Sequence, residues 1–272
     1  MWYNFSKYFT AHIIPIKSTG ENDYINIISA ETATGEMFLK DKRWDIMEFK
    51  PEMGNGVDSW KEVNLVYNSA LREISTKLEI LNDEFQHVHQ YNPIEHIKSR
   101  IKTPESIVKK LRKNGYESTI PNMVKYVNDI AGIRVICSFT SDIYRIAEML
   151  IKQSDLKVIS VKDYIQRPKP SGYKSYHLIV TVPVFLSDRI VDAKVEIQIR
   201  TVAMDFWASL EHKIHYKFEG NVPEHIKREL IECASMVSDL DMRMLSLNEE
   251  VQHQLHQETV PDPLVIKKAS GG

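Results

Sequence analysis

The sequence contains little cysteine, no long apolar run and almost no net charge. Its 272 residues include two cysteines, Cys137 and Cys233, and no CxxC pair, so neither a disulfide framework nor a zinc knuckle is expected. No stretch approaches the roughly 18 apolar residues that a membrane span needs, and the first residues lack the pattern of a signal peptide. The formal charge of -2 argues against a cationic body that coats nucleic acid. We therefore expect a cytoplasmic protein that does not act in a membrane, and any basic site must be local.

The composition, with 43% hydrophobic and 26% charged residues, is that of an ordinary globular chain with one large or two small domains. Residues 1–57 contain short strand-like stretches and then the turn-rich "PEMGNG", so we treat them as an N-terminal extension of unknown role. The main domain is expected over residues 58–258. The last residues, 259–272, are expected to be a disordered tail.

Two long amphipathic helices are predicted at the ends of this domain. The first begins at Asp58, a suitable N-cap, and its apolar residues recur at steps of three and four. They are Trp60, Val63, Tyr67, Ala70, Ile74, Leu78, Leu81, Phe85 and Val88. Pro223 opens the second helix, whose apolar residues are Ile226, Leu230, Ala234, Val237, Leu240, Leu247, Val251 and Leu255. Such helices either pack on the centre of the domain or join subunits, and the sequence leaves both interpretations open.

The centre, residues 92–220, mixes helix and strand. "AGIRVICSF" and "LIVTVPV" are typical of buried strands, and "KVEIQIR" alternates apolar with polar residues. Lysine-rich "IVKKLRK" and the longer "VAMDFWASLEHKIHYKF" are typical of helices. The pattern predicts an α+β fold, a mixed β-sheet flanked by helices.

A first candidate site lies in "KSRIKTPESIVKKLRK". Thr103 and Pro104 form a helix start that places Ser106 and Lys110 on one face, one turn apart. Free backbone N–H groups at such a start, with donors from Arg100 and Lys102, favour a polyphosphate. The alternative is a solvated lysine-rich helix that buries Ile107, Val108 and Leu111.

Two acidic residues and one arginine in the predicted sheet form a second candidate site. Arg134 lies among apolar neighbours and therefore needs an acceptor or an aromatic partner. Asp129 and Glu196, on neighbouring strands, have the ligand type for one magnesium ion shared with phosphate oxygens. The alternatives are a structural Asp–Arg pair and, for Glu196, a cross-strand Glu–Lys or Glu–Arg pair on a solvated sheet face.

The loop "PKPSGYKSYH" combines a turn with donors and an aromatic ring. Ser171 and Gly172 allow a sharp turn that exposes Tyr173 as a platform. Lys169 and His177 flank it, and an aromatic face stacks on a nucleobase. The loop therefore predicts a second nucleotide site.

Four segments together resemble the synthetase domain of the RelA/SpoT homologue family, and most of all its single-domain small alarmone synthetases. In chain order they are "SRIKTPESIVKK", "DIAGIRVICSF", "KDYIQRPKPSGYKSYH" and "VEIQIRTVAMDFWASLEHKIHYK". The resemblance covers roughly Trp60 to Leu255 and implies a nucleotidyltransferase-like fold. It also implies transfer of the β,γ-pyrophosphate of ATP to the 3′-hydroxyl of GDP or GTP, which yields (p)ppGpp and AMP for the stringent response.

The resemblance assigns a role to each candidate residue. Arg100 and Arg134 would enclose the adenine, and the ATP phosphates would bind Lys102, Ser106 and Lys110. Asp129 and Glu196 would hold magnesium, with Glu196 also accepting the proton of the attacking hydroxyl. The acceptor nucleotide would contact Lys169, Tyr173, His177 and Gln198, with Tyr173 stacked on guanine.

The resemblance further implies a homotetramer with the two long helices at its interfaces. No His-Asp dipeptide of the kind used by the family's hydrolase domains occurs, so synthesis without hydrolysis is expected. Two alternatives remain. One is a relative that pyrophosphorylates the 3′ end of tRNA, against which the charge of -2 argues, and the other is a non-catalytic nucleotide-binding or RNA-binding regulator, which would be expected to lack one of the two carboxylates.

Overall fold

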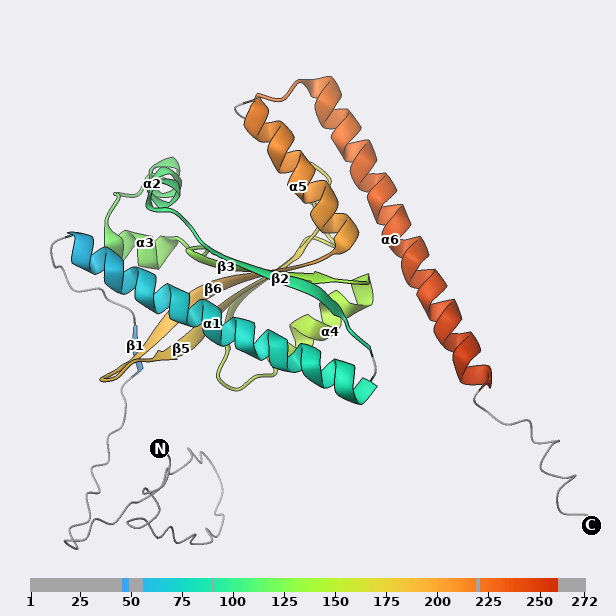
Figure 1. Cartoon of the computed structure of the whole chain (residues 1–272). Coiled ribbons are helices and arrows are strands. Elements are labelled where there is room, and N and C mark those ends of the chain that lie inside the picture. The colour runs from blue at the N-terminus through green and yellow to red at the C-terminus, as the bar shows by residue number, and fades with distance from the viewer. Residues whose placement is uncertain (1–45, 49–55, 90, 219–220, 259–272) are drawn as a thin grey trace, which may run out of the picture. The chain divides into compact units, whose positions relative to one another are not determined.

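The computed structural model describes residues 46–48, 56–89, 91–218 and 221–258, and these build a mixed sheet with helices on both faces (Figure 1). The strands are β1 (Ile46–Glu48), β2 (Ile94–Ile101), β3 (Ala131–Cys137), β4 (Lys157–Asp163), β5 (Tyr176–Phe185) and β6 (Ile190–Thr201). They are ordered β2-β3-β6-β5-β4, and β1 also pairs with β6. The β3–β6 and β1–β6 pairs are parallel and the other pairs antiparallel. The predicted α+β fold is confirmed.

The helices are α1 (Gly56–His89), α2 (Pro104–Lys113), α3 (Ile120–Tyr126), α4 (Thr140–Ile151), α5 (Val202–Lys217) and α6 (Glu224–Glu258). Both long helices are therefore confirmed, with α1 starting two residues before the predicted Asp58. Strand β2 was not predicted, because its burial does not alternate.

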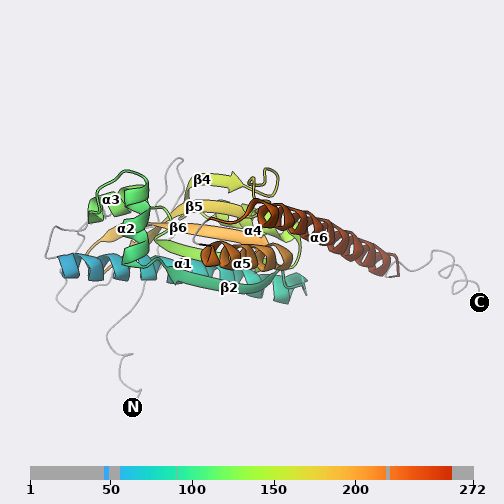
Figure 2. The same cartoon turned by 90° about the horizontal axis from the view of Figure 1, so that it is seen from above.

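The apolar face of the sheet packs against α1 and α4. Val195, Ile197 and Ile199 of β6 are fully buried. They share one core with the predicted stripe of α1 and with the apolar side of α4, and Figure 1 shows both helices on the same side of the sheet. Val88 is wrongly placed in that stripe, because its side chain is 66% exposed. The opposite face has α2 over one end and α5 over the other (Figure 2).

The first half of helix α6 packs on the domain. Trp207 of α5 and Ala234 of α6 form a second small core with Tyr173, and the Trp207 indole N–H donates to the Leu230 carbonyl at 2.9 Å. Further along α6, Leu240, Leu247 and Val251 are about half exposed. The first part of the predicted apolar stripe therefore packs on the domain, and the second part faces outward.

The predictions for the extension and the tail fall mostly outside the described residues. Of the predicted extension, the structure describes only Ile46–Glu48 and the first residues of α1. It does not describe residues 259–272. Among the described helices, none has both the length and the apolar character that a bilayer crossing requires.

Candidate active site

Polar side chains from four strands collect in two rows on the sheet face away from the main core. In one row Arg100 of β2 pairs with Gly132 of β3, which pairs with Glu196 of β6. In the next row the cross-strand partners are Lys98, Arg134, Gln198 and His177. Directly paired residues point to the same face, so the alternation of β6 gathers charged side chains at the centre of the sheet.

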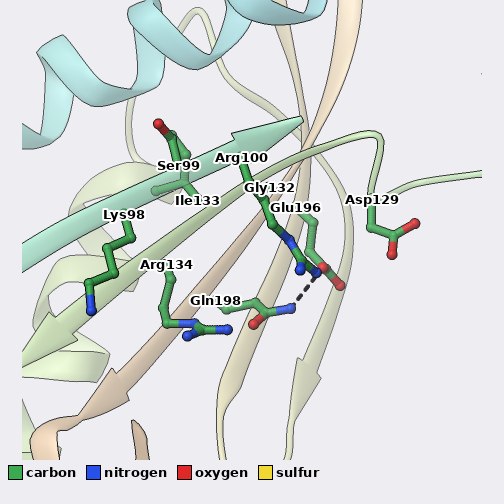
Figure 3. Close-up of a pocket in the computed structure, with 9 residues that line it drawn as sticks. All are labelled: Lys98, Ser99, Arg100, Asp129, Gly132, Ile133, Arg134, Glu196 and Gln198. Carbon is green, nitrogen blue, oxygen red and sulfur yellow. Dashed lines mark hydrogen bonds between the residues drawn. The ribbon is translucent and has the colours of Figure 1, made fainter. Parts of the chain in front are cut away.

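All the residues of these rows except His177 line a cavity of about 230 Å³. Its walls are Lys98, Ser99, Arg100, Asp129, Gly132, Ile133, Arg134, Glu196 and Gln198 (Figure 3). Five residues predicted from separate segments thus meet in one place: Arg100, Asp129, Arg134, Glu196 and Gln198. Lys98 and Ser99 were missed, because recognising them required β2 and its pairing with β3.

The predicted phosphate-binding helix start lies beside Asp129. Thr103 is the N-cap of α2, and its side chain accepts a hydrogen bond from the Ser106 backbone. The ammonium groups of Lys102 and Lys110 each lie 2.7 Å from one Asp129 oxygen. Burial by itself raises the pKa of Asp129, but the two lysines outweigh it and hold the pKa below its ordinary value. Helix α2 also fits the alternative interpretation, a lysine-rich helix with a buried apolar side, because Ile107 and Leu111 are buried.

Glu196 is held by two hydrogen-bonding partners. Gln198 donates to one oxygen at 2.8 Å, and His177 Nδ1 lies 3.4 Å from the other. Burial raises the pKa of Glu196, but these partners outweigh it and the net pKa is lowered. The carboxylate is therefore ionised at neutral pH and oriented from both sides.

The turn at Gly172 is confirmed, with φ of +86° and its N–H donating to the Lys169 carbonyl at 2.8 Å. Tyr173 is only partly exposed, and the Lys169 ammonium lies 4.5 Å from its ring centroid. The expected open platform is therefore already contacted by a cation. His177 is the second residue of β5 rather than a loop residue, and it is 7% exposed.

Two charged residues outside the predicted set support this site. Asp205 of α5 contacts Arg134 at 3.1 Å and Arg200 at 3.2 Å through the same oxygen. Arg134 Nε is buried and has no hydrogen-bond partner among the described residues. The alternation of β6 already placed Arg200 on the polar face. No local pattern singled out Asp205.

Residues 99–221 match the profile described as "Region found in RelA / SpoT proteins". The chain is 51% identical over 195 residues to the GTP pyrophosphokinase YwaC of Bacillus subtilis, an alignment that covers 72% of this chain and 93% of that protein. The chain belongs to the RelA/SpoT family. Within that family it groups with the small alarmone synthetases.

Solved structures of small alarmone synthetases share this fold. The chain is similar to small alarmone synthetase 2 of Bacillus subtilis, with 49% identity, a TM-score of 0.65, and coverage of 70% of this chain and 98% of that one. It is also similar to small alarmone synthetase 1 of the same organism bound to its product pppGpp, with 37% identity, a TM-score of 0.66, and coverage of 71% and 98%.

The donor set of this synthetase fits a magnesium ion. Asp129 and Glu196 line the same cavity, and the nearby charge of Asp129 contributes to raising the pKa of Glu196. Magnesium is commonly held by one or two carboxylates together with substrate phosphates and water. No cluster of three or more His, Cys, Asp or Glu side chains that could hold a metal ion occurs in the part of the chain that the structure describes.

Proposed function

We propose that this cavity is the site where the GTP pyrophosphokinase transfers the β,γ-pyrophosphate of ATP to the 3′-hydroxyl of GDP or GTP. The 3′-oxygen forms a bond to the β-phosphorus, the bond from that phosphorus to the α,β-bridging oxygen breaks, and AMP leaves. The observation that carries the proposal is the oriented carboxylate of Glu196, which lines one cavity together with Asp129, Arg100 and Arg134.

The donor nucleotide is assigned to the side of the cavity formed by β2, β3 and α2. Arg100 and Arg134 present guanidinium groups that stack on an adenine ring. Lys102, Ser106 and Lys110 surround the start of α2, where ammonium groups and backbone N–H groups suit the triphosphate. In this structure both lysines bind Asp129. When ATP binds, their ammonium groups turn toward its phosphate oxygens.

The acceptor nucleotide is assigned to the side formed by β5, β6 and residues 168–175. Tyr173 supplies the ring for guanine, and Lys169, His177 and Gln198 supply polar contacts. Burial lowers the pKa of Lys169 although Glu196 opposes that shift, and an anionic phosphate nearby would favour the charged form further.

Glu196 accepts the proton of the attacking 3′-hydroxyl. Its lowered pKa keeps it ionised, and the hydrogen bonds from Gln198 and His177 fix its orientation. Asp129 and Glu196 would hold magnesium, which neutralises phosphate charge when it is bound. The remaining contribution is positioning, since phosphoryl transfer needs little covalent chemistry from a protein.

Incubation with γ-labelled ATP, magnesium and either GDP, GTP or deacylated tRNA tests this function. We expect label in guanosine tetra- or pentaphosphate, and its loss by at least about 100-fold in Glu196→Gln. Glu148→Gln is the matched control, because Glu148 is 65% exposed and pairs with Lys152 on the surface of α4. Label confined to tRNA would indicate the tRNA-modifying branch instead, and no label in any acceptor would contradict the proposal.

We further propose that the chain works as a cytoplasmic homotetramer, with residues 58–258 as its synthetase domain. Support comes from the outward-facing part of α6. Leu240, Met244, Leu247 and Val251 recur at steps of four, three and four residues, and each is about half exposed. Such spacing forms one apolar stripe, which suits packing against a helix of another subunit.

A further inference from the structure

Arg200 is a buried arginine next to the proposed acceptor site. Its residue surface is 3% exposed, and it does not line the cavity. A guanidinium that is taken out of water is stable only when its N–H groups find acceptors. The hydrogen bonds of Arg200 therefore indicate which side chains it holds in position.

All three nitrogens of the Arg200 guanidinium donate hydrogen bonds. Nε donates to the Ser175 hydroxyl at 3.3 Å, and one terminal nitrogen donates to Asp205 at 3.2 Å. The other terminal nitrogen donates to the Tyr173 hydroxyl at 2.5 Å and to the Gln198 side-chain oxygen at 2.9 Å. Two of these four acceptors, Tyr173 and Gln198, are residues assigned to the acceptor nucleotide.

The same nitrogen starts two chains of hydrogen bonds that end on the two oxygens of Glu196. In one chain Gln198 accepts from Arg200 through its oxygen and donates to Glu196 through its nitrogen. In the other, the Tyr173 hydroxyl accepts from Arg200 and lies 2.8 Å from His177 Nε2. His177 Nδ1 then faces Glu196. Because Arg200 can only donate, the Gln198 oxygen and the Tyr173 hydroxyl oxygen both accept from it. When the Tyr173 hydroxyl donates its own proton to Nε2, a neutral His177 carries its proton on Nδ1, toward Glu196.

We infer that Arg200 is a positioning residue for the acceptor nucleotide, an inference that rests on the proposed function. Through one terminal nitrogen it sets the position of the Tyr173 ring and the orientation of the Gln198 amide. It thereby also fixes the two groups that orient Glu196. Through its other terminal nitrogen it binds Asp205, the residue that also contacts Arg134.

Lysine cannot replace arginine in this role. A lysine ammonium at the end of a flexible chain does not present donors in the planar fork that reaches Ser175, Asp205, Tyr173 and Gln198 together. The Arg200→Lys variant keeps the positive charge but loses at least one of these bonds. Its effect should fall on the acceptor nucleotide, because Tyr173 and Gln198 belong to that side of the site.

Steady-state kinetics with GTP and ATP varied in turn test the inference. For Arg200→Lys we expect the KM for GTP to rise about tenfold or more, the loss typical of one charge-assisted hydrogen bond. The KM for ATP should stay within about threefold of that of the parent protein, since the donor side keeps its own contacts. Arg189→Lys is the matched control, because Arg189 pairs with Glu62 at 2.7 Å outside the cavity and should change neither KM.

Thermal unfolding establishes whether each variant is folded. A folded Arg200→Lys protein with an unchanged KM for GTP, or with equal rises in both KM values, overturns the inference. If Arg200→Lys does not fold, Tyr173→Phe decides, because it keeps the ring and removes only the hydroxyl that Arg200 holds. A several-fold rise in its KM for GTP supports the inference, and no change overturns it. Failure of the proposed function would give a different result from failure of this inference, because the parent protein itself would then transfer no label to GDP or GTP.

Discussion

Gly172 lies so close to Ala234 that a β-carbon added to Gly172 would be 2.5 Å from the Ala234 β-carbon. The acceptor loop therefore rests directly on α6. Lys174 also donates to Ser238, and the Thr201 hydroxyl at the end of β6 lies 2.6 Å from Asp241. The first half of α6 thus supports the loop that presents Tyr173.

Gly172→Ala should impair the acceptor site. The residue has a positive φ of +86° and no room for a side chain, so both backbone strain and a steric clash oppose alanine. We expect the free energy of unfolding to fall by about 2–5 kcal/mol, the sum of these two terms, and the KM for GTP to rise. Denaturant unfolding and acceptor kinetics measure the two effects.

Gly115→Ala is the control for that prediction. Gly115 also has a positive φ, +78°, but a β-carbon there would meet nothing within 4 Å. Alanine at this position should cost only the strain of about 1–2 kcal/mol and leave the KM for GTP unchanged. Equal losses in the two variants would contradict the close packing of Gly172 on α6.

The partly buried carboxylates of the site should make stability depend on pH in the acid range. The pKa values of Asp129 and Glu196 lie below the ordinary 3.8 and 4.5 in the folded protein, so the unfolded chain binds more protons there. Their stabilisation is complete above those ordinary values and is lost as the pH falls through the lower folded ones. Asp129→Asn with Glu196→Gln should flatten the rise of unfolding free energy with pH in this region.

Glu148→Gln is the matched control for the pH prediction. Its pKa is also lowered, through Lys152, but its side chain is largely exposed to solvent, and such pairs contribute little to stability. Chemical denaturation at a series of pH values compares each variant with the parent. If the slope of unfolding free energy against pH stays unchanged in the double variant, Asp129 and Glu196 are not the groups responsible for the acid dependence.

Leu247→Glu should weaken self-association. Leu247 is 55% exposed within the outward-facing stripe of α6, and a carboxylate buried at an apolar helix interface is costly. We expect light scattering after gel filtration to show a smaller mass for this variant than for the parent. Ser246→Glu adds the same charge off the stripe and should leave the mass unchanged. Equal masses for Leu247→Glu and the parent would count against an interface here.

A truncation that begins at Asp58 should fold and retain synthesis. Every residue assigned to the two nucleotides lies beyond it, although the truncation removes β1, which pairs with Ile190–Asp192 of β6. The loss of these few backbone hydrogen bonds should lower the unfolding free energy by about 1–3 kcal/mol. A truncated protein that folds but makes no (p)ppGpp would show that the extension takes part in the reaction.

Much of the site was predictable because its local patterns are strong. The Thr103 cap of α2, the alternation of β6 and the turn at Gly172 all depend on residues close in sequence, and all three are confirmed. Strand β2 was missed because its residues are mostly exposed and do not alternate. Without β2, the contributions of Lys98 and Ser99 to the cavity had no signal in the chain.

The sequence alone determined most helices and strands and the chemical character of the site. Hydrophobic periodicity, helix caps and tight turns depend on residues close together in the sequence, and the family motifs occur in a specific order. Only the tertiary structure decided which charges meet. The parallel pairing of β3 with β6 aligns Arg134 with Gln198, and the packing of α5 brings Asp205 to two arginines. It also decided that α6 buries Ala234 but leaves Leu247 exposed. Such outcomes depend on strand register and helix packing between distant segments, which local sequence patterns do not encode.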